Sequence, residues 1–300
     1  MVKPCTDQVS LVVLTYNRST ELCRSLQRLT ALPDQPRIIV VDNGSTDDTV
    51  DCVQRRFPQV ELIEAGVNLG AAGRNLGVEH VRTPYVAFSD DDTWWAPGAL
   101  CTAAGILDEN SEVTVLVARI MVGVEERADP TSMAMSQSPL GHIAGIGPLL
   151  VGFMAGACVM RSEAFREAGG YWRHFFIGGE ETLLAMDIID AGGRIVYAPK
   201  LRVHHWPSSL RDDPLRRKLL ARNAIWTAWL RLPARLAWQR SVQALHAFPA
   251  LALRGRIVAD ALAGASTILR NRRVLSKETC EMFERVWRHE ALAATAAKTR

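Results

Sequence analysis

Apolar and polar positions along the first 200 residues alternate in a way that predicts strands separated by helices. Short apolar runs of strand type occupy residues 9–14, 37–41, 60–63 and 85–89. Between them, helical spacing of the apolar positions predicts helices over residues 20–32, 47–57 and 70–80. Two more strands, near 113–117 and 194–197, and a helix over 180–191 complete the pattern. This β-α-β-α order predicts an α/β fold in which helices flank a mostly parallel sheet.

Polar side chains cluster at the point where each of the first four predicted strands ends. The clusters are Thr15 to Asn17, Asp42 with Asn43, Asn68, and Asp90 to Asp92. Ligands of open α/β sheets bind beyond the carboxyl ends of the strands. Four clusters at the same edge therefore predict a binding site there.

The sequence changes character after Pro207. Residues 211–300 hold long helical patterns rich in Arg, Trp, Leu and Ala, interrupted at Pro233 and Pro249. We therefore expect an α/β domain over residues 1–208 and a C-terminal helical extension over 209–300. Basic residues interleaved with tryptophans suit the headgroup layer of an anionic membrane, which predicts a peripheral contact through 209–240. A helix packed on the domain with its arginines in water explains the same pattern, and both interpretations stay open.

Composition narrows the class of protein. The 35 basic and 32 acidic residues nearly cancel, so the net charge of +3 does not suggest a nucleic-acid partner. The six cysteines form no C-x-x-C pair and are predicted to be buried free thiols in a reducing cytosol. The N-terminus lacks a signal-peptide core, and the longest apolar stretch, residues 149–160, is shorter than the ~20 residues of a membrane span. We expect a cytoplasmic protein, with at most a peripheral contact with the inner membrane face.

The Asp90-Asp91-Asp92 triplet is the strongest chemical signal. Adjacent carboxylates repel one another, and a divalent cation relieves that cost when it also binds substrate phosphates. The triplet thus predicts a Mg²⁺ or Mn²⁺ site, with a solvated acidic turn as the alternative.

Three other segments permit both a structural and a functional interpretation. Asp42 precedes a turn in which Ser45 or Thr46 are candidate helix caps, but it could equally accept hydrogen bonds from a nucleotide base or ribose. The glycine-rich residues 68–77 could pack a helix closely or present backbone donors to a diphosphate. The acids of 178–181 could complement a helix dipole or supply a general base.

Taken together, these motifs resemble those of the family-2 nucleotide-sugar glycosyltransferases with the Rossmann-like GT-A fold, including bacterial enzymes that add sugars such as rhamnose to cell-surface glycans. The matching stretches are residues 12–18, 40–47, 68–77, 88–92, 156–161 with Phe165 and 169–170, 179–181 and 203–205. They follow the family's order and cover about residues 9–206. The resemblance implies nucleotide-sugar binding by about 9–100 and an acceptor and base part over about 101–208.

The resemblance also implies roles for individual residues. Contacts with the nucleotide sugar fall on Thr15, Tyr16, Asn17, Arg18, Asp42, Asn43, Arg74, Asn75, Asp90 and Asp91. The metal ligands fall on Asp90 and Asp92, with His204 or His205 in reach, and the acceptor side includes Trp95 and Gly156. Glu181 stands where the family usually has an aspartate as base, so Glu180 and Glu181 both stay candidates.

These roles imply an inverting, metal-assisted transfer from a UDP- or dTDP-sugar to a hydroxyl of a glycan, a lipid-linked carrier or a small molecule. One alternative is a protein that binds nucleotide sugars without catalysis, suggested by the unusual Glu181. Another is an enzyme that makes the donor, but such enzymes ordinarily carry a basic glycine-rich loop after the first strand, where this chain has Thr15 to Arg18.

Overall fold

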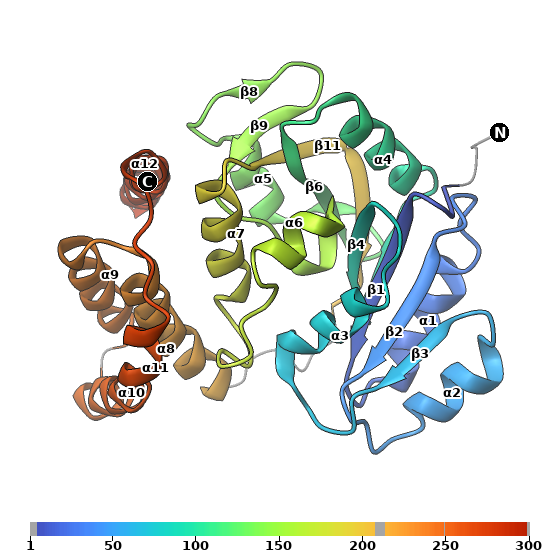
Figure 1. Cartoon of the computed structure of the whole chain (residues 1–300), viewed down its shortest axis with the longest axis horizontal. Coiled ribbons are helices and arrows are strands. Elements are labelled where there is room, and N and C mark those ends of the chain that lie inside the picture. Colours follow the sequence, from blue (N-terminus) through green and yellow to red (C-terminus); the bar gives the residue numbers. More distant parts are fainter. Residues whose placement is uncertain (1–4, 208–213, 249, 299–300) are drawn as a thin grey trace.

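A single large sheet forms the centre of the computed structural model, which describes residues 5–207, 214–248 and 250–298 (Figure 1). Its strands are β1 Val9–Thr15, β2 Arg37–Asp42, β3 Glu61–Glu64, β4 Tyr85–Asp90, β5 Thr93–Trp95, β6 Val113–Val122, β7 Arg127–Ala128, β8 His142–Ile143, β9 Gly147–Leu150, β10 Cys158–Arg161 and β11 Arg194–His205. The order across the sheet is β3-β2-β1-β4-β10-β6-β11-β9-β8.

Strands β3, β2, β1 and β4 are parallel neighbours, as the β-α-β-α pattern predicts. Strand β10 is inserted antiparallel between β4 and β6, and β11 runs parallel to β6. The register sets Thr15 beside Asp42 and Leu14 beside Asp90. The carboxyl ends of three adjacent strands therefore meet at one edge, and the polar clusters meet with them.

Alternation along the strands divides the core into two layers, one on each face of the sheet. Helices α1 Ser19–Leu29, α2 Thr49–Arg56 and α4 Ala99–Glu109 pack with Val9, Leu11 and Val13 of β1. The opposite face carries α3 Gly73–Glu79, α6 Ser162–Glu167 and α7 Glu180–Asp190, which pack with Val12. The helices on both faces bury alternate side chains of the same strand, so the predicted α/β sandwich is confirmed. The short elements α5 Pro130–Ser136, η1 Gly70–Ala72 and η2 Ala155–Ala157 connect the strands.

Five helices follow the sheet: α8 Pro214–Arg231, α9 Ala234–His246, α10 Leu251–Ala263, α11 Ala265–Arg270 and α12 Lys277–Lys298. They stack beside α7 (Figure 1), and Ala228, Leu232 and Phe283 join the same core cluster as the sheet. The expected boundary at 208 and residues 209–213 of the basic stretch lie outside the described residues. In the part of the chain that is described, no helix combines the length and apolarity needed to cross a bilayer.

The two tryptophans of α8 pack within the protein, whereas Trp238 of α9, in the same predicted 209–240 segment, is 65% exposed, so the peripheral contact stays a prediction. Trp226 is buried, and its Nε1 donates to the Ala261 carbonyl at 2.9 Å. Trp229 Nε1 donates to Ser241 Oγ at 3.1 Å. Both rings face neighbouring helices, because the apolar stripe of α8 finds its partner within the protein.

Some elements differ from the sequence pattern. Strand β11 runs to His205, well past the predicted end near 197, because a bulge between Ala198 and Arg202 lets pairing with β6 resume beyond the interruption. The apolar stretch 149–160 divides into β9, a turn and the inserted strand β10. Helices α4, α5 and α6 were not predicted. The buried positions of α4 follow helical spacing, so its signal was present in the sequence, whereas α5 and α6, with 7 and 6 residues, are too short to give a clear period.

The expectation of six free thiols is wrong for two cysteines. Cys23 of α1 and Cys52 of α2 form a disulfide, with Cα atoms 7.0 Å apart. These helices cover the same face of the sheet, which brings together residues 29 positions apart. The remaining four cysteines, all within the described residues, form no disulfide.

Candidate active site

The aspartate triplet occupies the turn where β4 ends and β5 begins, and its three side chains point in different directions. Asp90 is 35% exposed and forms an ion pair with Arg74 of α3. Asp91 and Asp92 are buried. The row is therefore not a solvated acidic turn but part of the interior of the binding edge.

Arg18, just before α1, compensates the two buried carboxylates. Its Nη1 lies 2.9 Å from Asp91 Oδ1 and 3.2 Å from Asp92 Oδ2. Thr15 adds a hydrogen bond from Oγ1 to Asp91 Oδ2 at 3.2 Å. Burial nevertheless raises the pKa of Asp91 to about 7, with Asp92 and Asp90 adding to the rise against Arg18. Two arginines, Arg18 and Arg74, thus face three carboxylates, and this imbalance favours binding of a further cation.

The two histidines at the end of β11 face opposite sides of the strand. His205 Nε2 lies 3.6 Å from Asp92 Oδ1 and makes no hydrogen bond within the described residues. His204 instead stacks on Trp94 with ring centroids 5.5 Å apart, and its Nδ1 contacts Glu126 at 3.2 Å. Successive side chains of a strand alternate, so His205 faces Asp92 while His204 faces Trp94 and Glu126 on the other side.

Asp42 at the end of β2 satisfies only one of its carboxylate oxygens. Its Oδ2 accepts from the N–H groups of Gly44 and Ser45 at 3.1 and 3.0 Å. Its Oδ1 is buried without a hydrogen-bond partner in the described residues. The turn-forming role is therefore present, and a second acceptor is left over for a ligand donor. Neither Ser45 nor Thr46 caps α2, because Asp47 accepts from the N–H of Thr49 at 3.1 Å.

Residues 16–18 connect the first two strand ends. Tyr16 is 43% exposed. Asn17 adopts a left-handed backbone with φ of 51°, its N–H donates to Ser45 Oγ at 2.8 Å, and its Oδ1 accepts from the Thr46 N–H at 2.7 Å. Asn17 thus ties the β1 and β2 loops together and leaves Tyr16 as the exposed ring of this edge.

The two asparagines near the glycine-rich segment hold the backbone in place. Asn43 Nδ2 donates to the Gly70 carbonyl at 2.9 Å. The Asn75 amide exchanges two hydrogen bonds with the Tyr171 backbone, at 2.8 and 2.9 Å. In this structure both amides position the turn around Arg74 by contacts within the protein.

The two residues expected on the acceptor side have different surroundings. Trp95 is fully buried, and its Nε1 donates to the Phe88 carbonyl at 3.2 Å. It is a core residue, so the prediction of an acceptor contact is wrong. Gly156 lies against Asp90, since a Cβ there would stand 2.7 Å from Asp90 Oδ2. The absence of a side chain at 156 leaves the Asp90 carboxylate its room.

The acid pair opens α7 on the other side of Arg74. Gly178 and Gly179 have φ of 88° and 89°, a conformation that favours glycine and turns the chain into the helix. Burial raises the pKa of Glu180 to about 7, with the Glu181 charge adding to it. Burial also raises the pKa of Glu181, opposed by Arg74 and by the backbone of Ala155. A carboxylate whose pKa is raised accepts a proton more readily, which suits a general base.

Asn223 of α8 is a residue that the sequence motifs did not reveal. It is fully buried, and its Nδ2 lies 3.0, 3.0 and 2.6 Å from the carbonyls of Phe175, Ile177 and Gly178. It therefore fastens the loop before Glu180 to the C-terminal helices. The available signal was a single amide in the apolar stretch of α8, where a buried polar group needs partners.

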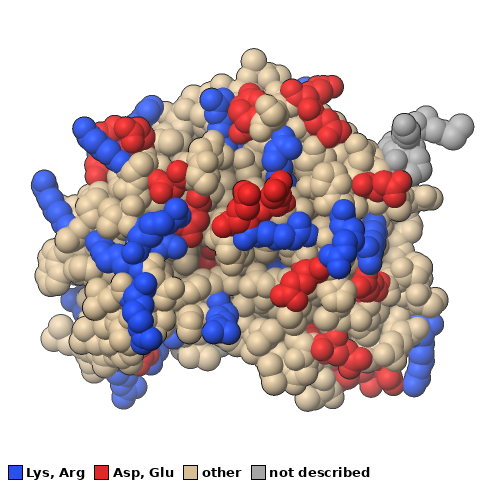
Figure 2. Space-filling model, viewed as in Figure 1, with Lys and Arg blue, Asp and Glu red and all other residues tan. Residues whose placement is uncertain are grey.

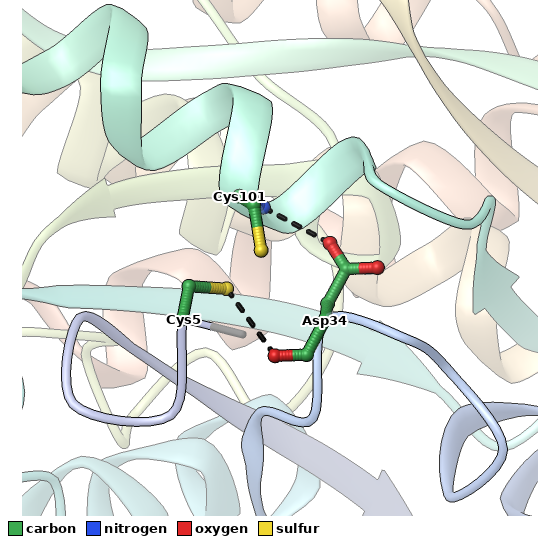
Figure 3. Close-up of side chains that lie close together, drawn as sticks. All are labelled: Cys5, Asp34 and Cys101. Atoms are coloured by element: carbon green, nitrogen blue, oxygen red, sulfur yellow. Dashed lines mark hydrogen bonds between the residues drawn. The ribbon is translucent and has the colours of Figure 1, made fainter. Parts of the chain in front are cut away.

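A separate cluster of potential ligands lies at the opposite edge of the sheet. Cys5, Asp34 and Cys101 come together near the amino ends of β1 and β2 (Figure 3). Among the described residues, this is the only set of three His, Cys, Asp or Glu side chains whose ligand atoms lie within 4.8 Å of one another. Asp34 accepts from the N–H groups of Gly98 and Cys101 at 2.6 and 3.0 Å, so its carboxylate caps α4. Burial raises the pKa of both thiols. Capping and burial explain this cluster without a metal.

Comparison with known proteins agrees with this geometry. The family model described as glycosyl transferase family 2 matches residues 10–169. The N-acetylglucosaminyl-diphospho-decaprenol L-rhamnosyltransferase of Mycobacterium tuberculosis is 27% identical over 248 residues, covering 70% of this chain and 80% of that protein. The poly(ribitol-phosphate) β-N-acetylglucosaminyltransferase TarS of Staphylococcus aureus is 25% identical over 215 residues, covering 67% of this chain but only 37% of TarS.

Solved structures share the fold at low sequence identity. TarS residues 1–349 in complex with UDP-GlcNAc superpose with a TM-score of 0.60 at 17% identity, covering 85% of this chain and 71% of that one. The mannosyltransferase PcManGT of Pyrobaculum calidifontis, in complex with GDP-Man and Mn²⁺, gives 0.59 at 18% identity, covering 93% and 84%. The sheet order, the strand-end carboxylates and a family match over more than half of the chain agree, and the chain is a GT-A glycosyltransferase that belongs to glycosyltransferase family 2.

Proposed function

We propose that this glycosyltransferase transfers a sugar from a nucleoside diphosphate donor to an acceptor hydroxyl in a single displacement that inverts the anomeric carbon. The observation that carries the proposal is the position of Arg74. Its guanidinium is buried and forms an ion pair with Asp90 of the aspartate triplet. It also interacts electrostatically with Glu181 and Glu180. The donor edge and the acid pair are therefore parts of one electrostatic unit, with a base within reach of the sugar-binding edge.

We assign the base to Glu181. Its carboxyl interacts with Arg74, Asp90 and the Ala155 backbone, which frame the donor edge, and the residue is only half-buried. Glu180 is 6% exposed, and an acceptor hydroxyl has little access to it. Glu181 takes the acceptor proton while the acceptor oxygen bonds to the anomeric carbon, and the bonding pair of the breaking bond leaves with the nucleoside diphosphate.

A divalent cation, Mg²⁺ or Mn²⁺, fits the residues present. Asp92 Oδ1 and His205 Nε2 are buried and 3.6 Å apart, and carboxylate oxygen with imidazole nitrogen is a donor set that Mn²⁺ accepts. Bound there, such an ion would neutralise charge on the leaving diphosphate. Arg18 keeps Asp92 in place.

The donor and acceptor classes are inferred from the relatives. A UDP- or dTDP-sugar is the proposed donor, because TarS is solved with UDP-GlcNAc and another relative is named as an L-rhamnosyltransferase. A glycan or lipid-linked saccharide is the proposed acceptor, because that relative is named for a diphospho-decaprenol. Such acceptors belong to cell-surface glycan biosynthesis.

The reaction is tested with donor and acceptor panels. UDP- and dTDP-sugars are incubated with a short-chain N-acetylglucosaminyl-diphospho-prenol and Mn²⁺, and the product is read by mass spectrometry. Glu181→Gln should lower kcat at least about 100-fold, the range for loss of a general base, and Glu180→Gln much less. Full activity of Glu181→Gln, or equal loss in both variants, would refute the assignment.

The cation site is tested by melting temperature. Mn²⁺ with UDP should raise the Tm of the wild-type protein, because a ligand that binds only the folded state stabilises it. His205→Ala should remove most of that rise, while His204→Ala should retain it. A Tm rise unaffected by His205→Ala contradicts the ligand pair.

A further inference from the structure

The charge of the chain is strongly segregated along its length. Residues 214–276, which span α8 to α11, contain 12 Lys and Arg residues and a single acid, Asp260. Residues 1–213 contain 18 basic and 27 acidic residues, so the net charges are +11 and −9. The near-neutral total conceals a cationic helical region attached to an acidic catalytic region.

Much of this positive charge is at the surface. Figure 2 shows blue side chains gathered over the C-terminal helices, with few acidic ones among them. Asp260 forms an ion pair with Lys218 at 2.6 Å, and Arg231 forms one with Asp187. Arg256 of α10 and Arg270 of α11 are exposed, and neither forms an ion pair with a described residue.

An exposed apolar ridge runs along the same helices. Leu251 and Leu262 of α10 are 78% and 68% exposed, and Leu269 of α11 is 67% exposed. Positions 251, 255, 259 and 262 lie on one helical face, and Gly255 and Ala259 between the leucines are also exposed. We call Leu251, Gly255, Arg256, Ala259, Leu262, Leu269 and Arg270 the α10–α11 surface. It carries no acid.

We propose that the α10–α11 surface binds an anionic lipid bilayer, with its leucines entering the headgroup boundary and its arginines contacting lipid phosphates. An apolar ridge flanked by arginines that form no ion pair with a described residue, with the acid of the same helix, Asp260, neutralised by Lys218, has the chemistry of a helix lying in a membrane interface. The 13-residue α10 is about 20 Å long, so its outer face is far smaller than the roughly 800 Å² that a stable protein partner requires on each side. A few exposed leucines, together with the net charge of +11 over residues 214–276, suit an anionic lipid surface better than a second copy of this chain.

This placement has a consequence for the acceptor. Helix α8 packs between α10 and the loop before Glu180, since Trp226 bonds to Ala261 while Asn223 bonds to Gly178. Attachment through α10–α11 would thus hold the acceptor end of the site near a bilayer that contains lipid-linked sugars. The inference goes beyond the proposed reaction and does not need it, because binding is measured without donor.

Vesicle co-sedimentation of the full chain provides the test. Vesicles in which phosphatidylglycerol makes up about a third of the lipid and phosphatidylcholine the rest should bind the protein. Vesicles of phosphatidylcholine alone should bind it weakly. Half-molar salt should release most of it, because screening shortens the reach of the arginines. Arg256→Ser and Arg270→Ser should each weaken the partition coefficient about fivefold, the equivalent of about 1 kcal/mol per basic residue.

Matched variants separate surface effects from folding. Leu251→Ser with Leu262→Ser should lower binding at least about tenfold, because each removes exposed apolar area. Leu292→Ser on α12, 71% exposed, should leave it unchanged. All variants should keep the wild-type Tm. Equal binding by the paired leucine variant, equal binding to neutral vesicles, or a dimer that this variant dissociates in the ultracentrifuge would each overturn the proposal. Loss of transfer activity in solution would bear only on the proposed reaction.

Discussion

Asp91→Asn should stabilise the protein at alkaline pH, although it removes an ion pair with Arg18. The carboxyl has an ordinary pKa of 3.8, and burial raises it to about 7 in the folded state. At about 1.4 kcal/mol per pH unit, the ionised form carries a cost of at most about 4 kcal/mol above pH 7. Asparagine has nearly the same shape and carries no charge, so it avoids that cost.

The sign follows from proton binding. Below about pH 4 both folded and unfolded chains hold the proton, and Asp91 costs nothing. Between about pH 4 and 7 the folded chain still holds a proton that the unfolded chain has lost, so the wild-type free energy of unfolding falls as pH rises. The difference between Asp91→Asn and wild type should therefore grow in favour of the variant from pH 5 to pH 8.

Urea denaturation at pH 5, 6, 7 and 8 measures this difference. Asp90→Asn is the matched control, because Asp90 is 35% exposed and its loss leaves the buried Arg74 without its partner. That variant should be destabilised at every pH. The reasoning fails if the difference in free energy of unfolding between Asp91→Asn and wild type is constant from pH 5 to 8, or if the variant becomes less stable relative to wild type as the pH rises. Either result would show that burial does not disfavour the ionised form of Asp91.

Two other substitutions address the geometry of the site. Gly156→Ala should lower kcat/KM for the donor at least about tenfold, because its Cβ would displace the Asp90 carboxylate. Gly152→Ala is the control and should leave kcat/KM unchanged, because there is open space around Gly152. Equal kinetics in both variants would contradict the contact between position 156 and Asp90. Asn223→Ala should lower kcat while the donor KM stays near the wild-type value. The substitution removes the hydrogen bonds that hold the loop before Glu180 and does not touch the residues at the strand ends. A rise in donor KM with unchanged kcat would assign Asn223 another role.

Local patterns determined a large part of this protein. The apolar runs of β1, β2 and β4 and the leucines of α1 follow periodicities of 2 and 3.6, which depend only on near neighbours in the chain. Because parallel strands end at one edge, Thr15, Asp42 and Asp90 could be expected together before any coordinates existed. The glycines at 178 and 179 likewise marked the start of α7 through their backbone freedom.

Contacts between distant segments decided the rest. The insertion of β10 between β4 and β6, the pairing of Cys23 with Cys52 and the hydrogen bonds from Asn223 to the 175–178 loop join residues 29 to 76 positions apart. The choice between His204 and His205 depends on which face of β11 turns toward Asp92, which is set by the register with β6. The burial of Trp95 and Trp226 depends on what packs against them. A sequence records which side chains are able to bury or bind, but only the assembled chain determines which of them meet, because those contacts are chosen by the packing of the whole.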